Sequence, residues 1–238
     1  MGDSVMSKIE ANEWSASTGS QVNILSGTTL DINSGATITN NGTATGFAAG
    51  FNSIQVFTSS GTWTRPSGVT KVVMEVQGAG GGGARNTGAG GAGGGAGGGC
   101  AIKVLDVSSI GTSTITVGAG GVSAGGSNAD GSAGGNTSWA DGTNTITGTG
   151  GGGGSSASYG GTDGATATGG DINLQGGDGA ANPQKGGGDA KWGTGGFNMQ
   201  PSEISQGYPR GYGSGAGGAY NRVPYDGAGG ILVVWEYL

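Results

Sequence analysis

The most informative segment of the sequence is Val69-Thr-Lys-Val-Val-Met-Glu-Val-Gln-Gly-Ala-Gly-Gly-Gly-Gly83, in which alternating apolar residues are followed by a glycine tract. Apolar side chains alternate at Val72, Met74 and Val76, which predicts a half-buried β-strand. The glycine tract that begins at Gly78 disfavours a helix by ~1 kcal/mol per glycine and gives a strand no side chains to pack. An extended, polyproline-II-like conformation remains, with three residues per turn and no hydrogen bonds within the run. The stretch therefore predicts a strand that continues into a polyglycine-II-like run.

Glycine tracts recur along most of the chain, between segments with strand-like patterns. Glycine accounts for 62 of the 238 residues, and its tracts are irregularly spaced, so we expect no fixed structural repeat. Several extended runs can lie side by side and hydrogen-bond to one another if glycine occupies the facing positions, because only glycine lets backbones approach so closely. We therefore expect a mostly β protein in which a short N-terminal stranded shaft precedes a β base with projecting, polyglycine-II-like runs. The expected strands include 54–57, 72–76, 101–107, 113–117, 137–139, 143–147, 171–174 and 231–237.

A disordered, low-complexity chain is the alternative, because glycine-rich segments commonly behave as flexible coil. The clear strand patterns on either side of the glycine tracts weigh against it. Trp63, Trp139 and Trp235 all lie in such strand-like segments, and we expect all three in the core.

Composition argues against several classes of function. The formal net charge is −6 and the nine basic residues form no cluster, so we expect no nucleic-acid partner. No apolar segment approaches the ~20 residues of a transmembrane helix, and the N-terminus lacks the pattern of a signal peptide, so we expect no membrane insertion. The chain has no histidine and a single cysteine, which removes most zinc sites and the side chain best suited to acid–base catalysis near neutral pH. We expect Cys100, beside a strand-like segment, to be buried and unreactive.

The N-terminal residues form a separate part of the sequence. Residues 1–20 are mixed and polar, and we interpret them as an attachment segment. In residues 21–50 apolar side chains fall at alternate positions, as at Leu30 and Ile32, and Ser-Gly and Asn-Gly breaks separate the short runs. Short strands of this kind leave open edges, which association with identical copies would cover, so we expect a β shaft that forms a homotrimer. An ordinary meander packed on the following domain, residues 51–238, is the alternative.

A longer segment carries a family resemblance. Phe57-Thr-Ser-Ser-Gly-Thr-Trp-Thr-Arg-Pro-Ser-Gly-Val-Thr-Lys-Val-Val-Met-Glu-Val-Gln-Gly-Ala-Gly-Gly-Gly-Gly83 resembles the glycine-rich domain of bacteriophage tail-fibre and receptor-binding proteins. Thr116-Val-Gly-Ala-Gly-Gly121 and Gly227-Ala-Gly-Gly-Ile-Leu-Val-Val-Trp235 are similar to recurring pieces of that family, so the likeness covers roughly residues 51–238. A more distant likeness is to the tip adhesins of T-even-like phages, which fold as packed polyglycine-II helices with variable loops that contact the host. Residues 21–50 depart from those adhesins, because they look like fibre shaft.

Acidic residues give no sign of a catalytic or metal site. Most of them in the glycine-rich part adjoin glycine, as in Asp141-Gly142, which is typical of turns. No spacing selects a carboxylate pair for glycan hydrolysis. Gly176-Gly-Asp-Gly179 is similar to one copy of a calcium-binding repeat, which is a weak signal without further copies. We expect no catalytic residue, no metal and no cofactor.

Aromatic residues of the C-terminal half are the candidates for recognition. They lie in polar, glycine-broken segments without strand periodicity, where tyrosine and tryptophan can give large contact area at low entropy cost and arginine can bind sugar or phosphate oxygens. Burial as caps on a core poor in side chains is the alternative for each ring. The candidate receptor-binding residues are Tyr159, Trp192, Phe197, Tyr208, Arg210, Tyr212, Tyr220, Arg222 and Tyr225.

Together with the resemblance, these residues lead us to expect a non-enzymatic tail-fibre or tip adhesin, located in the virion. Its partner would be a bacterial surface receptor, either an outer-membrane protein loop or a surface glycan. Other tail or fibre proteins of the virion are expected to bind through residues 1–50. A purely structural fibre or decoration protein is the first alternative, and a glycan depolymerase is the second.

Overall fold

The computed structural model describes residues 50–238 apart from 89–90, 158–161, 182–185 and 198–206. The chain divides into two units, Met1–Phe47 and Ala48–Leu238, and the described residues belong to the second. Strands and extended runs make up this unit, and no helix occurs among its described residues. The expected mostly β fold is therefore confirmed, whereas the expected attachment segment 1–20 and nearly all of the shaft 21–50 lie outside the described residues.

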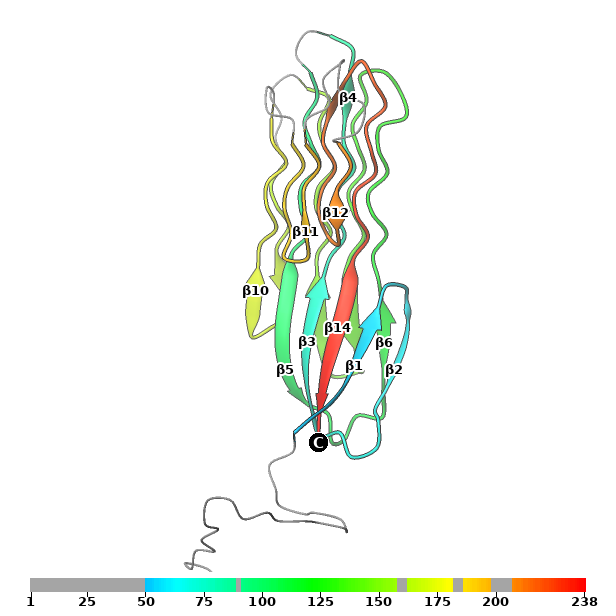
Figure 1. Cartoon of the computed structure of the whole chain (residues 1–238), viewed down its shortest axis with the longest axis vertical. Helices are drawn as coiled ribbons and strands as arrows, with labels where there is room; N and C mark the ends of the chain where they lie inside the picture. The colour runs from blue at the N-terminus through cyan, green and yellow to red at the C-terminus, as the bar shows by residue number, and fades with distance from the viewer. Residues whose placement is uncertain (1–49, 89–90, 158–161, 182–185, 198–206) are drawn as a thin grey trace, which may run out of the picture. The chain divides into compact units, whose positions relative to one another are not determined.

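Two five-stranded antiparallel sheets form the base of this unit (Figure 1). Apolar and polar residues alternate in most of these strands, so that one side of each sheet can face the other sheet. In order, the first sheet contains β1 (Phe51–Phe57), β14 (Ile231–Tyr237), β3 (Lys71–Gln77), β5 (Cys100–Asp106) and β10 (Ile172–Leu174). The second contains β2 (Gly61–Thr64), β6 (Thr112–Thr116), β7 (Thr137–Ala140), β8 (Thr145–Gly148) and β9 (Ala167–Thr168). Two short pairs lie outside the base, β11 (Gly193–Thr194) with β12 (Arg210–Gly211) and β4 (Arg85–Asn86) with β13 (Ala219–Tyr220).

The hydrophobic core lies between the two sheets and takes side chains from both. Trp63 of β2 and Trp139 of β7 are fully buried, and their ring centroids are 4.8 Å apart. Met74 of β3 and Leu232 of β14 face them from the first sheet and are also fully buried. Because each buried tryptophan removes a large apolar area from water, this small core can hold a chain that is otherwise poor in bulky side chains.

Trp235 does not belong to this core, so its expected burial there was wrong. It is half-buried, and it lies on the side of β14 opposite to Leu232 and Val234. The inward position beside it is taken by Glu236, a fully buried carboxylate that accepts a hydrogen bond from Trp63 Nε1 at 2.7 Å. β14 is apolar at nearly every position, so the sequence shows no alternation from which its inward side could be read.

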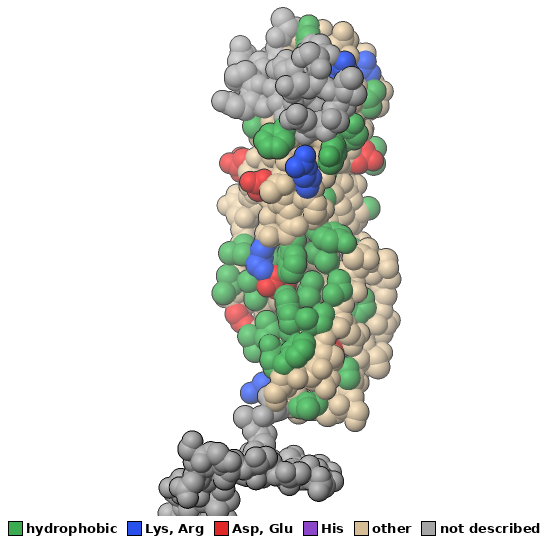
Figure 2. Space-filling model, viewed as in Figure 1, with side chains coloured by type: hydrophobic (Ala, Val, Ile, Leu, Met, Phe, Trp, Pro, Cys, Tyr) green, Lys and Arg blue, Asp and Glu red, His purple; other side chains and the backbone are tan. Residues whose placement is uncertain are grey.

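The outer surfaces of the two sheets differ sharply in chemistry. The second sheet exposes mainly threonine and serine side chains, among them Thr62, Thr114 and Thr145. On its outward side the first sheet carries apolar side chains from all five strands, which range from exposed in the edge strands to buried at Val233, and they gather on the side turned to the viewer in Figure 2. We call this surface the apolar face; its residues are Phe51, Ile54, Val56, Val73, Ile102, Val104, Ile172, Leu174, Val233, Trp235 and Tyr237.

Glycine runs extend the strands beyond the base, and they lie side by side (Figure 1). β3 continues into residues 78–84, and residues 93–99 lead into β5. Successive backbone N–H groups of run 78–84 donate in rotation to three different neighbouring runs, so the same neighbour recurs at every third residue. This is the threefold geometry expected for polyglycine II. The bonds run from Gly78 to Gly99, Ala79 to Gly135, Gly80 to Ala228, Gly81 to Ala96, Gly82 to Ser132, Gly83 to Tyr225, Ala84 to Gly93 and Arg85 to Ala129.

Run 93–99 shows the same rotation, and both runs are central to the bundle. Its N–H groups donate in turn to segments around residues 149–155, 177–180 and 213–216. The carbonyls of run 78–84 accept in turn from three further segments, so that six neighbours surround this run. The carbonyl bonds run from Gly151 to Ala79, Gly121 to Gly80, Ala216 to Gly81, Gly154 to Gly82, Ala124 to Gly83 and Ala219 to Ala84.

Candidate functional site

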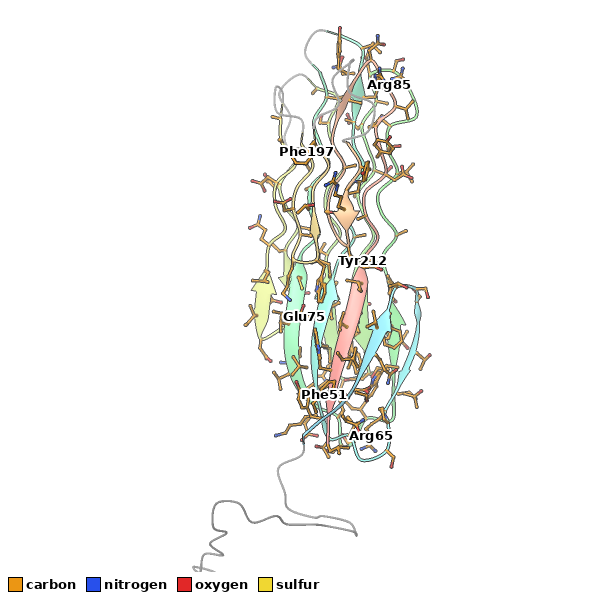
Figure 3. The ribbon with its side chains drawn as sticks, viewed as in Figure 1. Phe51, Arg65, Glu75, Arg85, Phe197 and Tyr212 are labelled. Atoms are coloured by element: carbon orange, nitrogen blue, oxygen red, sulfur yellow. The ribbon has the colours of Figure 1, made fainter. Side chains whose placement is uncertain are left out.

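The glycine bundle carries the aromatic residues that the sequence singles out. Tyr159 lies outside the described residues, and the other eight candidates lie between residues 192 and 225, in or beside the runs. Phe197 is the most exposed aromatic residue among them, with 62% of its surface accessible. Figure 3 places Tyr212 where the strands give way to the runs, and Phe197 farther along the runs toward Arg85.

Three of the candidates form one cluster. The rings of Tyr208 and Tyr225 meet edge to face with centroids 5.9 Å apart. The guanidinium of Arg210 stands over the Tyr208 ring, 5.5 Å from its centroid. Both tyrosines are more than a third exposed, and Arg210 is exposed as well. The cluster therefore presents a cation and two aromatic rings to solvent in a fixed arrangement, which suits contact with a polar surface rich in hydroxyl or carboxylate groups.

The backbone of the glycine bundle holds this cluster in place. The carbonyl oxygen of Tyr225 accepts the N–H of Gly83 at 3.1 Å, in the central run. Arg210 lies in β12, paired with Thr194 of β11. Because these anchoring bonds are made by main-chain atoms, the tyrosine side chains remain available for contact outside the chain.

Trp192 is held differently, through its side chain. Its indole Nε1 donates to Glu75 Oε2 at 2.8 Å, and Lys191 forms an ion pair with the same carboxylate. The Lys191 ammonium also lies 5.1 Å from the centroid of the Trp192 ring. No sequence pattern indicates this anchor, because Glu75 is more than a hundred residues away from Trp192 and lies on the outward side of β3. Trp192 thus has a structural role, because it links its segment to the outward side of β3.

The remaining candidates are distributed along the bundle. Tyr212 is exposed, and its N–H donates to the carbonyl oxygen of Trp192 at 3.0 Å. Tyr220, in the short strand β13 opposite β4, is half-buried, as is Arg222. The structure therefore brings Tyr208, Arg210 and Tyr225 into contact, whereas Tyr220 lies in β13 and Arg222 follows that strand by two residues.

A hollow of about 360 Å³ in the base contains two carboxylates, Asp106 and Asp141. Hydrogen bonds from Ser108 hold the pKa of Asp106 below its usual range. Partial desolvation acts to raise the pKa of Asp141, but hydrogen bonds from Asn144, Thr143 and the Trp139 indole lower it overall. Both groups are therefore ionised near neutral pH, so neither can serve there as the protonated acid of a glycosidase pair.

Cys100 is buried, as expected. Burial is the main cause that raises the pKa of its thiol to about 11, with a contribution from the nearby charge of Glu75. Since only the thiolate is a good nucleophile, this thiol is inert near neutral pH. Among the described residues, no three His, Cys, Asp or Glu side chains are grouped so that they could hold a metal ion.

The fold and the aromatic surface define a protein class: a β-sandwich base that carries a hydrogen-bonded glycine bundle with exposed aromatic side chains. The chain belongs to the glycine-rich domain family, whose sequence profile matches residues 55–235. A comparison with curated proteins found no match. In the described part of the chain, no helix has the length and apolar character needed to cross a membrane.

Proposed function

We propose that the chain is an adhesin of a bacteriophage tail fibre or fibre tip, which binds the surface of the bacterial host through the glycine bundle. The observation that carries this proposal is the exposed cluster of Tyr208, Arg210 and Tyr225, fixed to the bundle by main-chain hydrogen bonds. The resemblance of residues 57–83 to the glycine-rich domain of phage receptor-binding proteins supports it, and the chain's membership of the glycine-rich domain family is consistent with that resemblance.

The exposed aromatic rings favour host recognition over the role of a purely structural fibre protein, which would act as a spacer. A spacer has no need of exposed rings, whereas a binding surface gains from aromatic groups whose conformation is already fixed, since less entropy is lost on contact. Phe197 is 62% exposed on a run whose backbone is bonded to its neighbours, so it offers an anchor of this kind. The ligand would be an outer-membrane protein loop or a surface glycan.

Two further expectations from the sequence remain predictions. Attachment to other tail or fibre proteins through residues 1–50, and a homotrimeric shaft, concern residues outside the described part. A purely structural fibre protein is the alternative that the experiment below distinguishes. The ionised state of Asp106 and Asp141 weighs against the depolymerase alternative.

A triple substitution, Phe197→Ala with Tyr208→Ala and Tyr225→Ala, tests the proposal. The purified, fluorescently labelled chain is titrated onto intact cells from a panel of bacterial strains, and the variant is compared on a strain that binds the wild type. We expect the affinity to fall at least about tenfold, because truncating one anchoring aromatic commonly costs ~2 kcal/mol.

The matched control is Val122→Ala, since Val122 is 61% exposed and Phe197 is 62% exposed. This control should bind as the wild type does. Two outcomes would favour a purely structural fibre protein. In the first, the wild-type chain binds no strain; in the second, the triple variant folds normally and binds as tightly as the wild type.

A further inference from the structure

The apolar face is an unusual surface for a water-exposed sheet. Six of its side chains are more than a third exposed, and they come from three of the five strands, including both edge strands of the sheet. They are Phe51, Ile54, Val56, Val104, Ile172 and Leu174. The second sheet provides an internal comparison, because its outer side has the threonine and serine composition of a solvated surface.

The size of the apolar face is that of an interface. Four strands of seven residues and the three-residue β10, spaced ~4.8 Å apart with ~3.3 Å per residue, give a surface of roughly 490 Å². The largest apolar patch on an ordinary monomer is ~300–600 Å² and is often functional. Two such faces in contact would bury about 980 Å², which is close to the ~1,000 Å² that marks a specific association.

The charges on this face are balanced, which allows it to meet an identical face. Lys71 lies opposite Asp106 in the register of β3 and β5. Glu75 is neutralised by Lys191 and bonded by the indole of Trp192. A contact between identical surfaces brings like charges together unless each surface compensates its own, and here the compensation is built into one chain.

We propose that the apolar face is an interface between copies of this chain, covered by the same face of a second copy. This inference concerns the base and is independent of the proposed recognition by the bundle. It places self-association on the described sheet β1-β14-β3-β5-β10, and it therefore makes a prediction that holds whatever residues 1–50 do.

The test compares two double variants of the full chain by sedimentation velocity. Val56→Lys with Val104→Lys places charges on the apolar face, at side chains that are 54% and 56% exposed. Val122→Lys with Val223→Lys is the matched control, at side chains of the same type that are 61% and 57% exposed and lie outside both sheets. We expect the wild type and the control to sediment as oligomers, with masses of two or more times the 22.5 kDa of one chain. The face variant should associate at least about 100-fold more weakly, because like charges juxtaposed in an interface cost several kcal/mol.

Fluorescence of the buried Trp63 and Trp139 reports whether each variant folds. If the lysine variant does not fold, Val56→Ser with Val104→Ser replaces it and should weaken association in the same direction. A monomeric wild type would overturn the proposal and leave a different protein as the partner of this face. Association that is unchanged in the face variant, or lost equally in the control, would also overturn it.

Discussion

Single glycines in the central runs stand where no other residue has room. A Cβ atom placed on Gly81 would lie 1.9 Å from the carbonyl oxygen of Gly152, and one on Gly95 would lie 2.2 Å from that of Gly81. Backbone atoms cannot move away from such a contact as a flexible side chain could. These positions therefore require glycine because a side chain would not fit, and not because the backbone needs the conformational freedom of glycine.

Gly81→Ala should destabilise the fold by about 3 kcal/mol, because the methyl group must displace a neighbouring run that is bonded on several sides. The measurement is the free energy of unfolding in urea, followed by tryptophan fluorescence. Gly125→Ala is the control, since a Cβ there meets nothing within 4 Å. It should stay within about 1 kcal/mol of the wild type. Equal losses in the two variants would mean that the runs are not closely packed.

At the scale of the element, one buried carboxylate connects three strands of the base. Glu236 of β14 accepts hydrogen bonds from Ser53 and Gln55 of β1 and from Trp63 of β2. β14 and β1 belong to the first sheet and β2 to the second, so these bonds connect the two sheets. A buried charge with several donors is stable only while they all remain in place.

Glu236→Leu should cost about 1–3 kcal/mol of stability, because the Trp63 indole N–H is then buried without an acceptor. Glu236→Gln keeps the shape and one acceptor oxygen, so its loss should be smaller. Thermal unfolding followed by near-ultraviolet circular dichroism measures both. A Gln variant as unstable as the Leu variant would show that the hydrogen bond to Trp63 contributes little.

Individual strands and turns show where the sequence pattern predicts the structure correctly and where it does not. The strand expected around Val72, Met74 and Val76 is present as β3, and these three side chains face the core as their alternation predicts. Asp141-Gly142 forms the expected turn between β7 and β8, with Gly142 at φ +90°. Trp235 was placed wrongly, because β14 is apolar at nearly every position and its sequence therefore shows no alternation that separates the inward from the outward side.

At the scale of the whole unit, stability beyond the base depends on main-chain hydrogen bonds. Runs 78–84 and 93–99 form no bonds within themselves, yet each of their N–H groups donates to a neighbouring run. Neighbours that are over a hundred residues apart in sequence are joined in this way, as Gly95 is to Ala216 and Gly80 to Ala228. The bundle is therefore cooperative, because each run is stable only among its neighbours.

Hydrogen exchange followed by mass spectrometry tests this cooperativity. The amides of residues 78–84 and 93–99 should exchange as slowly as those of β3 and β14, because exchange requires the neighbouring runs to separate. Exchange at the rate of an unstructured glycine peptide would contradict the hydrogen-bonded bundle.

The sequence alone determined the composition of the fold: which segments are strands, where glycine excludes both helix and ordinary strand, and which rings stand outside any strand pattern. These features depend on local properties, namely side-chain alternation and the absence of a Cβ atom. Only the tertiary structure decided which runs are neighbours, that Tyr208, Arg210 and Tyr225 meet, that Glu75 anchors Trp192, and that one sheet has an apolar outer surface. Those outcomes depend on contacts between distant segments, and glycine tracts, having no side chains, carry no pattern that specifies their partners.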